Sequence, residues 1–305
     1  MISLKLLQRA ALPGVMALVL LSTASQAQQS YPAPEDAAAA LAAAVTSGPG
    51  DILKVLGKAA DDIVSSGDEV ADADTRQRFT SAYDTRHSIK AEGNKKATLI
   101  LGPDDFPFPI PLVNTKTGWE FDTDEGRIEV LYRRIGRNEL DAIQTCLAYV
   151  DAQNEYADKD RGEGAGVYAQ RIVSTPGKKD GLFWRDDADP SPLGALAAQA
   201  SAEGYKAGEA GPTPYRGYYF RILQGQGSDA PGGDLNYVVK GKMIGGFALV
   251  AWPAEYGNSG VMTLLVNHAG TVYQKDLGNR TDFIAKRIIV FDPDQTWKKV
   301  DAAKP

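Results

Sequence analysis

Apolar residues recur at helical spacing along the first third of the chain. The stretch that begins at Pro34, PEDAAAALAAAV, has proline at its start and two acidic residues in its first turn, which favours helix initiation. The glycines and proline of SGPGD end this helix, and the helical spacing resumes in ILKVLGKAADDIV (52–64) and in ADTRQRFTSAYDTRHSI (73–89). The pattern therefore predicts three helices, the last of which contains His87.

Beyond residue 95 the pattern changes to that of short strands, at 97–101, 106–113 and 118–123. The second of them contains alternating prolines at 107, 109 and 111. Because proline has no backbone N–H, this side of the segment cannot donate hydrogen bonds to a neighbouring strand, and the segment is expected at a sheet edge. Strand side chains alternate between faces, so Phe106, Phe108 and Ile110 are predicted to share one face. Two interpretations remain open for them: they cover the core, or they form an aromatic recognition surface.

A central helix is predicted from near Asn138. Its apolar residues fall at i, i+3, i+7 and i+10, which is one stripe of a helix: Leu140, Ile143, Leu147 and Val150. Cys146, the only cysteine in the chain, lies beside this stripe. A reactive cysteine needs an exposed, electropositive setting that lowers its pKa. The neighbours of Cys146 are mostly apolar, and we interpret it as a buried structural residue.

The last third of the chain is β-rich. Between residues 157 and about 214 the sequence is irregular apart from short ordered pieces such as SPLGALAAQASAEGY, which reads as a helix capped near Ser191. The strands that follow are expected within 218–224, 236–241, 245–252, 260–266 and 271–277. NHAG (267–270) joins the last two as a hairpin, with glycine where a positive φ is needed. A final helix over 280–291 is expected to close the fold, with Trp297 packed on it.

These elements predict an α+β protein of two subdomains. Residues 28–133 form helices plus a small antiparallel sheet, and residues 134–305 form a helix packed on an antiparallel sheet.

The first 27 residues have the features of a secretory signal peptide. Lys5 and Arg9 precede an apolar run that ends at Leu21, and small residues at 25 and 27 suit cleavage after Ala27. The apolar run is too short to span a bilayer comfortably, since this takes about 20 residues. The mature chain is therefore predicted to be soluble, without a transmembrane segment, and periplasmic or secreted.

Charge argues against a nucleic-acid partner. The whole chain carries a net charge of −6, and removal of the signal leaves 31 basic against 39 acidic residues, a net charge of −8. An acidic protein repels phosphate backbones, so nucleic acid is not expected as a partner.

The sequence does not match the spacing of the common catalytic and metal-binding motifs. The chain has no HExxH or paired Cys/His pattern for zinc, and the loop around Ser259 lacks the second glycine of a nucleophile elbow. FDTDEG clusters three carboxylates, which makes Asp122 and Asp124 weak calcium candidates, but its glycine falls out of register for an EF-hand loop. We assign no catalytic residue, no metal site and no cofactor.

Several motifs together resemble an exported bacterial family known only as domain of unknown function 2950. They are GWEFDTDEGRIEVLYRRIGRNELDAIQTCLAYVDAQNEYA, SPLGALAAQASAEGY, YRGYYFRILQGQG and GGFALVAWPAEYGNSGVMTLLVNHAGTVYQKDLG. The resemblance covers nearly the whole mature chain and implies no activity. The order of LDAIQTCLAYVDAQNEYA, GYYFRI and GTVYQKDLG is also similar to the globular part of pilins and pseudopilins, which implies a helix on an antiparallel sheet.

The sequence thus favours a non-enzymatic binding or assembly module of the bacterial cell envelope, with an unknown envelope protein or a small molecule as its partner. The candidate binding side chains are aromatic residues expected at the surface: Phe106, Phe108, Trp252 and Tyr256. The alternative is a small-molecule binding protein or a hydrolase with its pocket in the N-terminal half.

Overall fold

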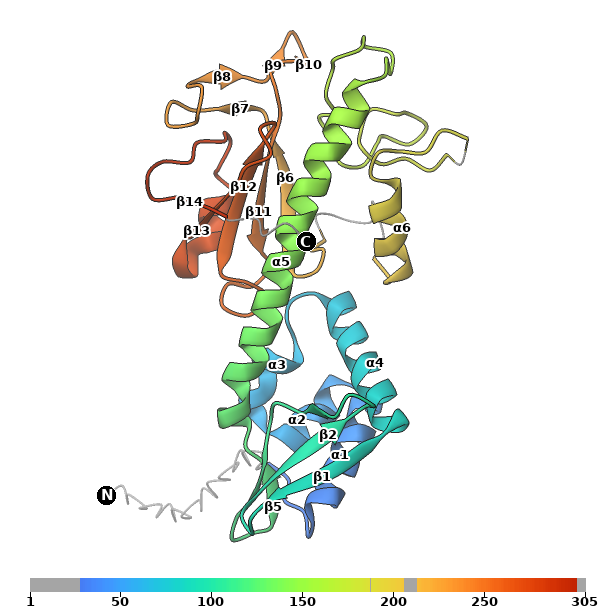
Figure 1. The fold of residues 1–305 in the computed structure, drawn as a ribbon, viewed down its shortest axis with the longest axis vertical. Coiled ribbons are helices and arrows are strands. Elements are labelled where there is room, and N and C mark those ends of the chain that lie inside the picture. Colours follow the sequence, from blue (N-terminus) through green and yellow to red (C-terminus); the bar gives the residue numbers. More distant parts are fainter. Residues whose placement is uncertain (1–27, 187, 206–212, 301–305) are drawn as a thin grey trace, which may run out of the picture.

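The computed structural model describes residues 28–186, 188–205 and 213–300. The predicted signal peptide lies outside these residues. Two lobes stand one above the other, and a single long helix runs from the first into the second (Figure 1). The fold is α+β with antiparallel sheets, as the sequence predicts.

The N-terminal lobe packs helices against a small sheet. Its helices are α1 (Pro34–Ser47), α2 (Pro49–Leu56), the 3-10 turn η1 (Lys58–Ala60), α3 (Asp61–Val64) and α4 (Glu69–Thr85). Its strands are β1 (His87–Glu92), β2 (Lys96–Leu101), β3 (Phe106–Pro107), β4 (Leu112–Asn114) and β5 (Trp119–Phe121). They pair in the order β1-β2-β4-β5, with β3 beside β2. Leu41, Val55, Leu112 and Phe121 lie in the core between helices and sheet.

Two local predictions for this lobe are wrong. His87 does not end a helix but begins β1, where it pairs with Leu101, because the chain turns to extended backbone at Arg86. The segment 106–113 is not one strand, because β3 ends at Pro107 and β4 begins at Leu112. The three apolar residues at 106, 108 and 110 differ in burial. Ile110 is buried and Phe108 packs on the core, whereas Phe106 is 48% exposed.

Helix α5 (Thr123–Ala157) is 35 residues long and begins 15 residues before the predicted start near Asn138. The side chain of Asp122 caps it by accepting a hydrogen bond from the N–H of Glu125. The first turns pack in the N-terminal lobe, where Gly126 lies directly against Ile110. The predicted subdomain boundary at 133/134 therefore falls inside a continuous helix.

The buried face of α5 includes three of the four residues of the predicted stripe: Val150 is buried, and Ile143 and Leu147 are partly buried against the core of the second lobe. Leu140 is 65% exposed, whereas Ala142, Cys146 and Tyr149 are buried against the second lobe. Cys146 is fully buried, in agreement with a structural role, and burial raises the pKa of its thiol to about 12.

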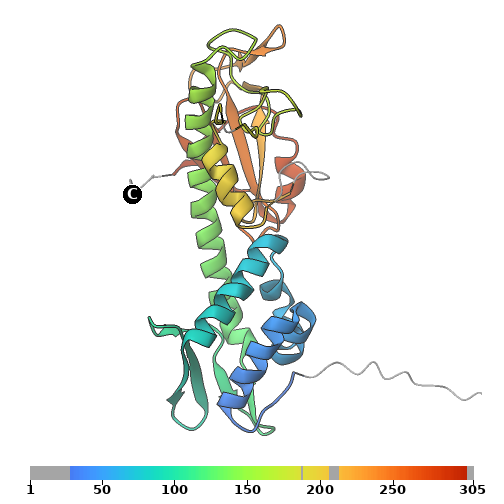
Figure 2. The ribbon, with the colours of Figure 1, turned by 90° about the vertical axis from the view of Figure 1, so that its right-hand side faces the viewer.

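The C-terminal lobe is a three-layered arrangement. Its sheet has the order β14-β13-β12-β11-β6. The strands are β6 (Tyr218–Leu223), β11 (Ala248–Pro253), β12 (Met262–Asn267), β13 (Val272–Asp276) and β14 (Lys298–Lys299). Helix α5 covers one face and the short helix α7 (Thr281–Ala285) the other (Figure 2). Every residue of β11 is buried because both faces of this central strand are covered.

The remaining elements of this lobe are short. They are the strands β7 (Gly225–Gln226), β8 (Leu235–Asn236), β9 (Val238–Val239) and β10 (Lys242–Met243), helix α6 (Gly194–Ala202) and the 3-10 turn η2 (Gly278–Arg280). Gly270 closes the predicted β12–β13 hairpin with φ 73°. The predicted closing helix over 280–291 is wrong in length, because α7 ends at Ala285 and the following residues are irregular. Trp297, which was expected to pack on that helix, packs against the C-terminal core.

A buried polar network joins the two lobes around Arg134 of α5. Its guanidinium donates to the carbonyl oxygens of Asp62 and Ile63 in the first lobe and to the side chain of Asn258 in the second. Asn258 in turn donates to the carbonyl oxygen of Ser65 at 2.9 Å. Arg134, Asn258 and Ile63 are buried, so breaking the network would leave buried polar groups unpaired.

In the part of the chain that the structure describes, no helix is both long and apolar enough to cross a membrane.

Candidate functional site

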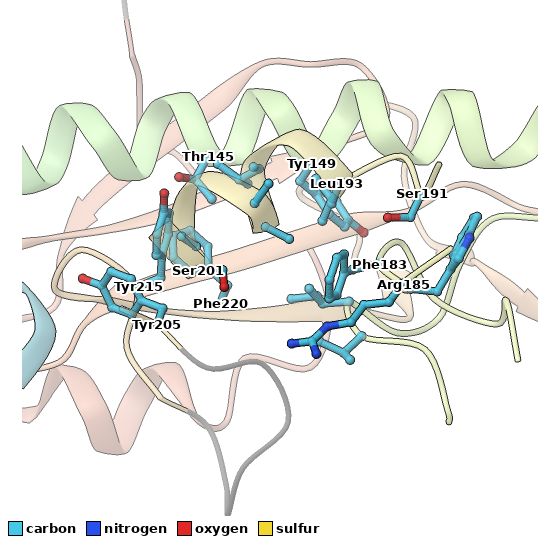
Figure 3. A pocket seen from close by; sticks show the side chains of 18 of the residues that line it. Thr145, Tyr149, Phe183, Arg185, Ser191, Leu193, Ser201, Tyr205, Tyr215 and Phe220 are labelled. Carbon is cyan, nitrogen blue, oxygen red and sulfur yellow. The ribbon is translucent and has the colours of Figure 1, made fainter. Parts of the chain in front are cut away.

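The C-terminal lobe contains a cavity of about 930 Å³. It lies beside α5 on the sheet face that α5 covers, and it is bounded by the irregular segment before α6 and by α6 itself (Figure 3). Most of its wall is apolar or aromatic, contributed by Ile172, Val173, Phe183, Trp184, Leu193, Leu196, Ala197, Ala200, Phe220 and Leu249.

Helix α6 forms one wall of this cavity instead of packing tightly on the sheet. Its sequence, GALAAQASA, is almost entirely small or apolar, yet no residue of α6 is buried. Leu196, Ala197 and Ala200 lie at helical spacing and line the cavity, whereas Ala195 is exposed outside it. The apolar face of the helix therefore faces an open space.

Two residues of the wall have a hydroxyl oxygen that is buried, with almost no surface open to the cavity, and that has no hydrogen-bond partner among the described residues. These oxygens are Oγ of Ser191 and the phenol oxygen of Tyr215. Ser191 does not cap α6 as the sequence suggested: the N-cap is Leu193, and no side chain caps the helix. Unpaired buried hydroxyls cost free energy, because they lose hydrogen bonds to water.

Tyr205 connects the cavity to the first lobe. Its hydroxyl donates to Oδ2 of Asp68 at 2.8 Å and accepts from the backbone N–H of Arg216 at 3.0 Å. Burial, together with the nearby Asp68 carboxylate, raises the pKa of this phenol well above its ordinary value. Tyr205 is therefore a neutral donor across the ordinary pH range, and its hydroxyl is already engaged.

Charged side chains lie at the rim of the cavity. Asp186 accepts a hydrogen bond from Lys179 at 2.8 Å, which lowers the pKa of this carboxyl. Arg185 also lines the cavity and is exposed. Among the described residues that line the cavity, the charged ones are Arg185 and Asp186, and both are at least partly exposed to solvent.

The four aromatic candidates from the sequence do not come together and do not line this cavity. Phe106 lies in the N-terminal lobe with the guanidinium of Arg133 5.0 Å from its ring centre. Phe108 packs against Phe79 and Phe121 in the core of that lobe.

The other two candidates are in the C-terminal lobe. Trp252 is only 4% exposed, and its indole N–H donates to Asp282 of α7 at 3.2 Å. It is therefore a buried residue between sheet and helix. Tyr256 is half-buried, and its hydroxyl donates to Asp276 at 3.2 Å.

Of the two weak calcium candidates, Asp122 serves as the helix cap of α5, while Asp124 is exposed in the first turn. Among the described residues, no group of three or more His, Cys, Asp or Glu side chains has an arrangement that could hold a metal ion.

Sequence reasoning identified α6 but missed the cavity beside it. The available signal was the composition of α6, a helix with too few large apolar side chains to fill the space against a sheet. Its partners in the wall come from positions between Thr145 and Leu249, and their proximity is created only by folding.

The sequence profile of the family described as "Protein of unknown function (DUF2950)" matches residues 28–300. The chain belongs to this family. The DUF2950 match covers both lobes, helix α5 and the residues that line the cavity. The chain has no significant match among the curated proteins and none among the solved structures. The resemblance to pilins therefore remains a sequence-based hypothesis.

Proposed function

We propose that this protein binds a small molecule of mostly apolar surface in the cavity between α5, α6 and the sheet, and that it acts by binding instead of catalysis. The observation that carries the proposal is the apolar face of α6 lining a cavity of about 930 Å³. Its volume is within the range of small-molecule sites, roughly 300–1,000 Å³.

Packing physics supports this proposal. Protein interiors are close-packed. Removal of apolar surface from water stabilises the folded protein by about 25 cal/mol for each Å² that is buried. Collapse of α6 onto the sheet would bury Leu196 and Phe220, yet both remain partly exposed. A ligand with an apolar surface would supply the missing contacts.

The location differs from that of the sequence-based alternative. That hypothesis placed a pocket in the N-terminal half, whereas this cavity is formed by residues 145–249 of the C-terminal lobe. The proposal keeps the idea of small-molecule binding and moves the site.

Export is a second part of the proposal. The charged and apolar pattern of residues 1–27 supports cleavage after Ala27 and function in the periplasm or outside the cell. Mass spectrometry of the protein from the source cells tests this directly. A mature N-terminus at Gln28 is expected, and an intact Met1 in the mature fraction would contradict export by this route.

Filling the cavity from α6 tests the binding function. Ala200→Trp places an indole on the face of α6 that lines the cavity, while Ala195→Trp places the same group on its exposed face. Binding of the neutral dye Nile red, measured by its fluorescence, should be lost in Ala200→Trp and kept in Ala195→Trp. Circular dichroism would establish that both variants are folded. Equal dye binding by both folded variants would refute the proposed site.

Assembly with an envelope protein is the second candidate function. An exposed stripe on α5 favours it: Ile128, Tyr132 and Leu140 are 55%, 70% and 65% exposed and lie four or eight residues apart. Crosslinking in intact cells should capture a recurrent partner with the wild type, and Tyr132→Arg should reduce the capture. The exposed position Glu155, changed to Arg, serves as the control on the same helix. Recovery of the protein without a partner would eliminate this candidate.

A further inference from the structure

We propose that strand β1 is a self-association edge, at which the β1 strands of two copies of this chain pair antiparallel about a two-fold axis through Ile89. β1 (His87–Glu92) is the terminal strand of the N-terminal sheet, and among the described residues it pairs with β2 alone (Figure 1). The partner is a second copy of the chain, and the proposal does not depend on the cavity.

Alternate residues of β1 direct their backbone groups away from the sheet. The N–H of Phe108 donates to the carbonyl oxygen of Leu99 at 2.8 Å, so residue 99 of β2 bonds on the side of β3, and residues 98 and 100 bond to β1. The N–H of Gly102 donates to the carbonyl oxygen of Arg86 at 2.8 Å, which continues the same alternation. The even-numbered residues of β1 therefore bond to β2, and residues 87, 89 and 91 direct their N–H and C=O groups outward.

The outward side of β1 is open to pairing. Natural edge strands commonly contain prolines or bulges that prevent a further strand from adding. β1 contains neither, since its six residues pair with β2 in one unbroken register, and every residue except Ile89 is exposed. At the opposite end of the sheet, β5 is covered by Tyr31, whose N–H donates to the carbonyl oxygen of Trp119 at 2.9 Å. In the part of the chain that the structure describes, the outward groups of residues 87, 89 and 91 have no backbone partner.

Charge selects the register of the pairing. With the axis at Ile89, Arg86 lies opposite Glu92 of the second copy, and Ser88 lies opposite Lys90 of the second copy. These are the closely spaced, non-hydrogen-bonded positions of an antiparallel pair, where opposite charges attract. An axis at Lys90 would place Lys90 opposite its own equivalent, and an axis at Ser88 would place it opposite Arg86. Like charges therefore disfavour both neighbouring registers.

The groups that would meet across the axis can make these contacts. Arg86 donates one N–H to the exposed Asp105, and its other donors remain for Glu92 of the second copy. Glu92 is exposed, and the hydroxyl of Thr98 donates to only one of its oxygens. Ile89 packs on the apolar clusters of its own lobe and would meet its equivalent at the axis. Because each copy contributes a single strand, the contact is small and the dimer is reversible.

Removal of one outward donor tests the pairing. Ala91→Pro removes the outward N–H of residue 91 and no bond to β2, whereas Ala91→Val keeps this N–H. The two-fold axis doubles the loss, so Ala91→Pro should raise the dimer dissociation constant at least about tenfold in sedimentation equilibrium. Ala91→Val should associate like the wild type. Circular dichroism would establish that both variants are folded, and equal association by the two folded variants would overturn the proposal.

Engineered disulfides test the register. In Ser88→Cys/Lys90→Cys, an axis at Ile89 places each Cys opposite the other kind, at a spacing that suits a disulfide. This double variant should form linked dimers under mild oxidation much faster than either single variant. The native Cys146 is fully buried and should not compete. Fast linkage of Lys90→Cys alone, or of Ser88→Cys alone, would move the axis to that residue and overturn the register.

Charge reversal provides an independent readout. Glu92→Arg places an arginine opposite Arg86 and should raise the dissociation constant at least about fivefold at low salt. Glu155→Arg makes the same change of charge at an exposed position of α5 in the other lobe and serves as the control. Added salt should reduce the difference between the two variants. Equal association of the two variants, or a wild type that stays monomeric up to about 1 mM, would overturn the proposal.

Discussion

The hydroxyl of Tyr205 donates a hydrogen bond to Oδ2 of Asp68 at 2.8 Å, across 137 positions of the chain. One of these residues lines the cavity of the C-terminal lobe and the other caps α4 of the N-terminal lobe. Gly217, next to the first strand of the second sheet, donates its N–H to the same Asp68 oxygen at 2.9 Å. The wall of the cavity is thus attached directly to the first lobe.

Loss of the Tyr205 hydroxyl should destabilise the protein measurably. A hydrogen bond to a charged acceptor contributes about 1.5–3 kcal/mol, and Asp68 is 2% exposed. Tyr205→Phe should therefore lower the free energy of unfolding by roughly this amount in urea titrations. Tyr132→Phe is the control, because Tyr132 is 70% exposed and should show no change. Equal stability of the two variants would mean that this bond is replaced by water at no cost.

The Arg134 network predicts a large difference between neighbouring arginines. Arg134→Ala should lower the free energy of unfolding by about 3 kcal/mol or more, because two carbonyl oxygens and Asn258 lose their buried donor. Arg133→Ala removes a partly exposed ion pair with Glu129 and should cost less than about 1 kcal/mol. Chemical denaturation of the two variants would measure both effects. Similar midpoints would show that the Arg134 network contributes little to the free energy of unfolding.

Two glycines of α5 should respond oppositely to alanine. A Cβ at Gly126 would lie 2.5 Å from Cα of Ile110, so Gly126→Ala should destabilise the protein by about 1–3 kcal/mol despite the better helix propensity of alanine. Gly136 has nothing within 4 Å of the corresponding position, and Gly136→Ala should stabilise by about 0.5–1 kcal/mol. Calorimetric Tm values should therefore move in opposite directions. A lower Tm for Gly136→Ala would indicate that this part of α5 is packed against something.

Alkaline unfolding should include a contribution from Cys146. Burial raises the pKa of its thiol from 9.0 to about 12 in the folded protein. Below pH 9 the thiol is protonated in both states, and the contribution to stability is fully present. As pH rises from 9 toward 12, the unfolded chain loses this proton first, so the free energy of unfolding falls by about 1.4 kcal/mol per pH unit.

Comparison with Cys146→Ala isolates this contribution, because the buried tyrosines are the same in both proteins. The difference in unfolding free energy between wild type and variant should be constant below pH 9 and should shift in favour of the variant above it. A difference that does not change between pH 8 and 11 would argue that the thiol ionises normally in the folded state.

Hydrophobic periodicity predicted the fold class and most elements correctly where the pattern is local. Proline and two acids at residues 34–36 start α1, and the alternation around NHAG gives the β12–β13 hairpin. It failed where helix ends and faces depend on distant contacts. The start of α5 depends on the Asp122 cap. The sheet covers the face of α5 that contains Cys146, which leaves Leu140 of the predicted stripe exposed. A stripe of apolar residues cannot indicate which of two adjacent faces a sheet will cover.

The sequence by itself determined the α+β class, the structural role of Cys146 and membership of the family, because each depends on residue types and their spacing. Only the tertiary structure decided that α5 is continuous through both lobes, that Trp252 is buried and that α6 lines a cavity. These features depend on residues distant in sequence, such as Thr145, Ser191 and Leu249, being brought together around one space. Such proximity arises from packing, for which a single sequence contains no direct signal.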